Sequence, residues 1–104
     1  MQGDEWHSVA SEVDVPEGEA KQAEVAGELI AIFNLGGRLY ATSDTCTHEE
    51  ASLCDGFIDG DTIECPLHQA IFHIPTGKVM AEPATKDLRV FPIRIENGTV
   101  QVQV

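Results

Sequence analysis

Two Cys/His pairs stand close together in the middle of this 104-residue chain. The first pair is Cys46 and His48, and the second, which begins after a further sixteen residues, is Cys65 and His68. Thiolates and imidazoles are favoured ligands of zinc and iron in proteins. A short chain that carries four such side chains in two neighbouring segments is therefore expected to fold around a metal centre.

The four side chains could hold either of two centres. A zinc ion would take all four in a tetrahedral arrangement, whereas a 2Fe-2S cluster can take the two thiolates on one iron and the two imidazoles on the other. The single residue between Cys46 and His48 makes it awkward for both side chains to bind one ion, but it suits two irons. The spacing therefore favours the cluster, and Pro66 stiffens the loop that carries the second pair.

Three further residues could bind metal but are predicted to have ordinary structural roles. Cys54 could replace an imidazole in a Cys3His zinc site, yet a small buried residue is the better prediction. His7 is predicted to lie at the surface or at a strand edge. His73 lies within the apolar run Ala70 to Ile74 and is predicted to be a hydrogen-bonded core or edge histidine.

Short strands are predicted for most of the chain outside the two pairs. Segments 19–25, 28–35 and 38–42 are strand-like, and Gly36-Gly37 predicts a tight turn between the last two. Asn97-Gly98 predicts a second hairpin, between segments 88–96 and 99–104.

The last segment shows the period of a strand with one buried face, because Val100, Val102 and Val104 alternate with polar residues. No long segment shows a helical period. The predicted fold class is all-β, a stack of small antiparallel sheets in one domain. Residues 1–42 and 78–104 are expected to form its base, and residues 43–77 an inserted loop-rich subdomain that holds the metal.

Acidic residues dominate the charge of the chain. Eighteen Asp and Glu stand against six Lys and Arg, which gives a formal charge of −12 and argues against partners such as nucleic acid or anionic membranes. Residues 39–77 contain no Lys or Arg. A negatively charged collar around the metal is therefore predicted, made of seven acids: Asp44, Glu49, Glu50, Asp55, Asp59, Asp61 and Glu64.

A cytoplasmic location is expected from the pattern of apolar residues. The opening residues MQGDEWHS are acidic and polar, unlike a signal or transit peptide. The longest apolar run, Leu29 to Phe33, is far too short to cross a bilayer.

The two pairs and the residues that follow them resemble the two motifs of the Rieske family. The matching stretches are Cys46-Thr47-His48, Cys65-Pro66-Leu67-His68, Phe72 and Thr76-Gly77. The resemblance implies one Rieske 2Fe-2S cluster, with Cys46 and Cys65 on one iron and His48 and His68 on the other. It also implies that the proline-containing segment Met80 to Ala84 covers the cluster.

The resemblance is greatest to the small Rieske ferredoxins of bacterial aromatic-ring-hydroxylating dioxygenases. It implies an electron carrier, not an enzyme, that takes electrons from an NADH-dependent flavoprotein reductase and delivers them to a terminal oxygenase. A monomer that forms transient complexes is expected. Two alternatives remain at this point: a small Rieske subunit of another redox enzyme, such as a nitrite-reductase-like system, and a zinc-stabilised interaction module.

Overall fold

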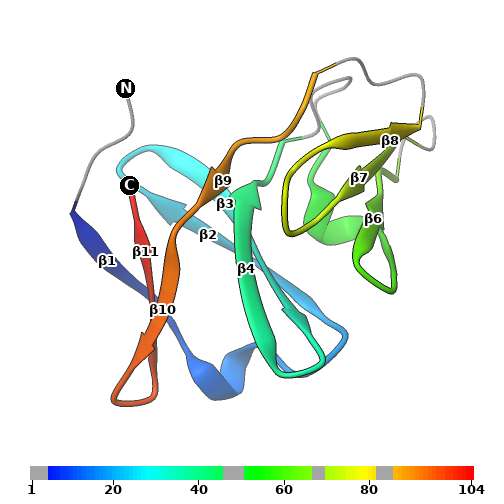
Figure 1. The fold of residues 1–104 in the computed structure, drawn as a ribbon. Helices are drawn as coiled ribbons and strands as arrows, with labels where there is room; N and C mark the ends of the chain where they lie inside the picture. Colours follow the sequence, from blue (N-terminus) through cyan, green and yellow to red (C-terminus); the bar gives the residue numbers. More distant parts are fainter. Residues whose placement is uncertain (1–4, 46–50, 67–69, 82–85) are drawn as a thin grey trace.

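The computed structural model describes residues 5–45, 51–66, 70–81 and 86–104 of the chain. These residues form three small antiparallel sheets and contain two short 3-10 turns but no α-helix (Figure 1). The all-β prediction is therefore confirmed. The N-terminal strand and the C-terminus lie beside each other, and the Val104 amide donates a hydrogen bond to the Glu5 carbonyl at 3.0 Å.

The first sheet joins the two ends of the chain. Its strand order is β1-β11-β10. Asn97 and Gly98 both have positive φ, 53° and 77°, as a two-residue hairpin turn with the right-handed twist of its strands requires. Val100 and Val102 are buried, whereas Val104 is half-buried. The sheet consists of β1 (Trp6–Ser11), β10 (Ile93–Glu96) and β11 (Thr99–Gln103).

The second sheet lies in the middle of the molecule, with strand order β2-β3-β4-β9. The three predicted strands agree with the structure to within one residue at each end, and Gly36-Gly37 forms the expected turn with positive φ at both residues. The sheet consists of β2 (Ala20–Val25), β3 (Glu28–Leu35), β4 (Arg38–Ser43) and β9 (Val90–Phe91).

One predicted strand was wrong, because segment 88–96 is divided between two sheets. Its first part, β9, pairs with β4, and its second part, β10, pairs with β11. Pro92 separates the two parts. Proline has no amide hydrogen to donate to a neighbouring strand, so it suits the point where the chain leaves one sheet for another.

The third sheet is built from the middle of the chain, with strand order β5-β6-β7-β8. A 3-10 turn, η2 (Leu53–Asp55), leads into it, while the other such turn, η1 (Glu12–Asp14), follows β1. The sheet consists of β5 (Phe57–Asp59), β6 (Thr62–Glu64), β7 (Ile71–His73) and β8 (Val79–Ala81).

Strand β3 separates two apolar cores. Ile30 and Ile32 pack on one side of it with Val100 and Val102 of the first sheet. Ala31 and Phe33 pack on the other side, in a core with residues of η2 and the third sheet. The uninterrupted apolar run in this strand thus reflects burial on both faces.

Candidate metal centre

Cys65 is the one predicted metal ligand that the structure describes. Cys46, His48 and His68 lie outside the described residues. Cys65 directly follows β6 and is 1% exposed. It belongs to the core between the second and third sheets, together with Ile63, Ala70 and Phe72. The thiol therefore lies in surroundings that exclude water.

The segment from Cys65 to Ala70 is closed at its base by a backbone hydrogen bond. The Cys65 amide donates to the Ala70 carbonyl at 2.7 Å. Strands β6 and β7 on either side pair in register, Glu64 opposite Ile71. The second predicted ligand pair thus belongs to a short connection between two paired strands, which fixes where its ends lie.

The segment that carries the first predicted pair is also closed at its base. Thr45 forms an antiparallel bridge with Ser52, and the Leu53 amide donates to the Asp44 carbonyl at 2.8 Å. Ala51, at the end of this segment, packs against the core that contains Cys65. The ends of both predicted ligand segments therefore meet on one apolar core.

This arrangement fits a 2Fe-2S cluster. Apolar surroundings control the access of water to such a centre and thereby its potential, and two anchored loops can present ligands to two irons with little rearrangement. The Cys65 thiol already lies in the core that both segments share. Among the described residues, no three His, Cys, Asp or Glu side chains gather in a way that could hold a metal ion.

Asp44 lies in the interior of the protein, unlike the other described acids near the metal centre. It was predicted to belong to the negative collar, but it is 1% exposed and contributes no surface charge. The only hint of this burial in the sequence is its position, directly after the strand segment and two residues before Cys46. Its oxygens accept hydrogen bonds from the Gln22 side chain at 2.6 Å and from the Cys54 amide at 3.2 Å.

Cys54 is partly buried, so the prediction of a small buried residue is only partly met. Burial raises the pKa of its thiol, and a hydrogen bond to Asp44 together with the negative charges of Asp44 and Asp55 raises it further. A metal ligand must be a thiolate, so these surroundings disfavour Cys54 as a ligand.

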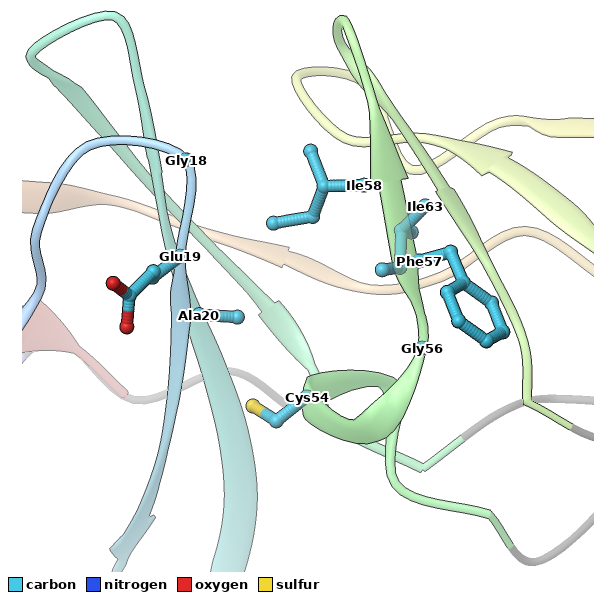
Figure 2. Close-up of a pocket in the computed structure, with 8 residues that line it drawn as sticks. All are labelled: Gly18, Glu19, Ala20, Cys54, Gly56, Phe57, Ile58 and Ile63. Carbon is cyan, nitrogen blue, oxygen red and sulfur yellow. The ribbon is translucent and has the colours of Figure 1, made fainter.

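The thiol of Cys54 points into an open groove of about 350 Å³ between the start of β2 and the edge strand β5 (Figure 2). Ile58 also points into this groove, whereas the ring of Phe57 points away from it (Figure 2). Phe57 is 65% exposed, the most exposed aromatic residue among those described. Phe57 lies opposite Glu64 in the sheet, and Glu64 directly precedes Cys65.

His73 makes the hydrogen bonds predicted for it, and His7 lies on the edge strand β1. His73, on β7, has one ring nitrogen 2.8 Å from an Asp61 carboxylate oxygen and the other 2.7 Å from the Thr76 hydroxyl. It is therefore hydrogen-bonded, as predicted, but it is half-buried on an inner strand of the sheet and lies neither in the core nor on an edge strand. His7, on β1, is half-buried and lies 3.9 Å from the carboxylate of Glu5.

The described acids near the third sheet are mostly exposed. Asp55, Asp59 and Asp61 face solvent, and Glu64 is half-buried. Glu49 and Glu50 of the predicted collar lie outside the described residues, as does most of the proline-containing segment Met80 to Ala84. In the described part of the chain, no helix is long and apolar enough to cross a membrane.

Comparisons with known proteins agree with this picture. The family model described as "Rieske [2Fe-2S] domain" matches residues 5–92. The ferredoxin component of the naphthalene 1,2-dioxygenase/salicylate 5-hydroxylase systems of Ralstonia sp is 42% identical over 99 residues, which are 95% of each chain. The ferredoxin subunit of the 3-phenylpropionate/cinnamic acid dioxygenase of Escherichia coli K12 is 44% identical over 92 residues, 88% of this chain and 86% of that protein.

A solved structure is similar over nearly the whole chain. It is a chain in the complex of reduced oxygenase and oxidised ferredoxin of carbazole 1,9a-dioxygenase, with a TM-score of 0.89 and 38% identity. The match covers 94% of this chain and 92% of that one. Fold and sequence thus agree on the same group of proteins.

Proposed function

This chain belongs to the Rieske [2Fe-2S] domain family, and on that premise we propose that it supplies electrons to the terminal oxygenase of an aromatic-ring dioxygenase system. It holds one Rieske 2Fe-2S cluster and is an electron-transfer ferredoxin, not an enzyme. The cluster, when bound, accepts and releases one electron at a time. In the proposed role the electrons come from an NADH-dependent flavoprotein reductase.

Four residues of this chain are proposed to hold the cluster. Cys46 and Cys65 bind one iron through their thiolates, and His48 and His68 bind the other through their imidazoles. The burial of Cys65 and the closed bases of both ligand segments support this assignment. We also propose that residues about 43–77 are the cluster-binding subdomain, inserted between base segments 1–42 and 78–104.

The main support for the proposed partners is that this chain matches known ferredoxin components over nearly their full length. The Ralstonia protein is a ferredoxin component of a naphthalene dioxygenase system, and the two chains cover each other to 95%. The carbazole 1,9a-dioxygenase structure contains a ferredoxin together with its oxygenase. Proteins that match from end to end at this identity commonly share their role.

The surface of the third sheet suits transient redox partners. The exposed Asp55 and Asp59 lie two residues on either side of the exposed Phe57, and Glu64, opposite Phe57 in the sheet, directly precedes Cys65. A basic partner would be steered toward this face by the charge, and the ring would add an apolar contact. Small interfaces of this kind separate readily between electrons. A cytoplasmic monomer fits this role.

Two measurements test the proposal in sequence. Iron and sulfide analysis with an EPR spectrum of the purified protein should show a Rieske cluster, whereas a colourless zinc protein would contradict the assignment. The protein is then added to the reductase and oxygenase of the Ralstonia naphthalene dioxygenase system without their own ferredoxin. Restored oxidation of naphthalene is expected. A cluster-containing protein that takes electrons from the reductase but never reduces the oxygenase would refute the proposed partner.

A further inference from the structure

Asp44 is the one charged side chain that is buried among the residues that the structure describes. Isolated buried charges are strongly unfavourable, so a buried carboxylate needs partners that satisfy it. The other buried polar side chain of the described residues, Thr42, is neutral. The chain thus places a negative charge in its interior directly beside the first ligand segment.

Hydrogen bonds from three parts of the fold hold Asp44 in place. Its amide donates to the Leu29 carbonyl of β3 at 3.0 Å, and its carbonyl accepts from the Leu53 amide of η2. One carboxylate oxygen accepts from the Cys54 amide at 3.2 Å, and the other accepts from Gln22 of β2 at 2.6 Å. Backbone and side chain of this residue therefore connect β2, β3 and η2.

These contacts fix both ends of the first ligand segment. Asp44 and Thr45 precede the segment, while Ser52 and Leu53 follow it. The bridge between Thr45 and Ser52 closes it, and the Gln22 side chain reaches toward Ser52 as well, at 3.4 Å from its hydroxyl. An isolated exposed acid would do none of this.

We propose that Asp44 is a positioning residue for the first ligand segment and that its buried negative charge lowers the reduction potential of the cluster. The proposal rests on the proposed function, since it requires Cys46 to be a ligand. Cys46 follows Asp44 by two residues, so covalent geometry alone keeps their Cα atoms within about 7 Å. A fixed negative charge in a poorly solvated site opposes the addition of an electron nearby.

Gln22 supplies a way to separate the two parts of this role. Its amide donates to the Asp44 carboxylate and so offsets part of the negative charge. Replacing Asp44 by Asn removes the charge and should raise the potential. The Gln22→Met variant keeps the charge but removes one of its two donors, and should lower the potential. A purely structural role would loosen the segment in both variants and shift both potentials in the same direction.

The experiment measures the reduction potential of the cluster-loaded protein by a redox titration followed by visible circular dichroism. The variants are Asp44→Asn, Gln22→Met and Gln22→Lys, with Gln101→Met and Gln101→Lys as controls. Gln101 is a matched control because its side-chain amide also donates to a serine hydroxyl, that of Ser8, but on the first sheet. Gln22→Lys places a cation beside Asp44 and should raise the potential more than Gln101→Lys does.

Each outcome has a clear meaning. Opposite shifts in Asp44→Asn and Gln22→Met, with Gln101→Met unchanged, support the proposal. Shifts of the same sign, no shift in either variant, or equal shifts for Lys at positions 22 and 101 overturn it. If Asp44→Asn fails to retain the cluster, the two Gln22 variants decide the question, because Gln22 is exposed and its replacement leaves the core intact. Absence of a Rieske spectrum in the unmodified protein would instead refute the proposed function.

Discussion

Replacing Gly77 by Ala should destabilise the protein more than any other glycine-to-alanine change in the third sheet. Gly77 has φ of +75°, a conformation that costs a residue with a side chain about 1–2 kcal/mol. A Cβ atom there would also collide with the Leu88 carbonyl and lie 2.9 Å from a methyl carbon of Val90. The Leu88 amide donates to the Gly77 carbonyl at 2.7 Å, so the collision falls where the third sheet meets the chain entering β9.

Two other glycines separate these effects. Gly60 has φ of +61° with open space around it, so Gly60→Ala tests the backbone cost alone, about 1 kcal/mol. Gly56 has an ordinary φ of −85°, but a Cβ atom would collide with the Glu64 carbonyl. Gly56→Ala therefore tests the collision alone, for which overpacking costs about 1–3 kcal/mol. Gly77→Ala combines both effects, for a total of about 3 kcal/mol.

The assay is thermal unfolding of the cluster-loaded protein at one heating rate. At about 4–8 °C per kcal/mol, Gly77→Ala should lower Tm by about 12–24 °C, against about 4–8 °C for Gly60→Ala. Far-ultraviolet circular dichroism follows the strands, and visible circular dichroism follows the cluster. A Gly77→Ala variant that loses no more stability than Gly60→Ala would refute the close approach of Gly77 and Leu88.

Four further predictions concern the cluster and its surroundings. His48→Ala and His68→Ala should abolish the Rieske EPR signal, while His73→Ala should keep it; its loss in His73→Ala would contradict the ligand assignment. The potential should lie near −150 mV, low in the Rieske range, because Ala70 and Phe72 have no hydroxyl to donate to sulfur; Ala70→Ser and Phe72→Tyr should each raise it in a redox titration. Stopped-flow reduction by the reductase should slow above about 0.1 M salt. Glu49→Gln, Glu50→Gln and Phe57→Thr should slow it more than the control Glu96→Gln, at an exposed position of β10 in the first sheet. A rate independent of salt and of these variants would leave the acids a role in solubility only. Because its surroundings raise the pKa of the Cys54 thiol, iodoacetamide at pH 8 should alkylate Cys54 far more slowly in the folded protein than in guanidinium, as followed by mass spectrometry of the peptide that contains Cys54. Equal rates at Cys54 would show that the thiol is not shielded.

The chemistry and the local turns could be predicted from the sequence. The pairs at Cys46 and Cys65 indicate the metal centre because ligand spacing is a property of the chain itself. Asn97-Gly98 predicts its hairpin because few residues adopt positive φ, and the alternation of Val100 and Val102 predicts a strand with one buried face. Each of these signals lies within a few residues of chain.

Other features depend on contacts between distant segments. The apolar run in β3 predicts a strand, but only the packing of two sheets against it shows that Ile30 and Phe33 lie in different cores. Segment 88–96 looks like one strand until β4 and β11 each pair with a different half of it. Apart from Pro92, no residue within the segment indicates that it pairs with two different strands.

The burial of Asp44 shows the same limit most clearly. In the sequence it is one of eighteen acids, and the residues next to it do not distinguish it from an acid at the surface. In the fold, Gln22 of β2 and Cys54 of η2, 22 and 10 residues away in the chain, donate to its carboxylate. A buried charge is tolerated only when such donors surround it, and only the tertiary structure brings them together.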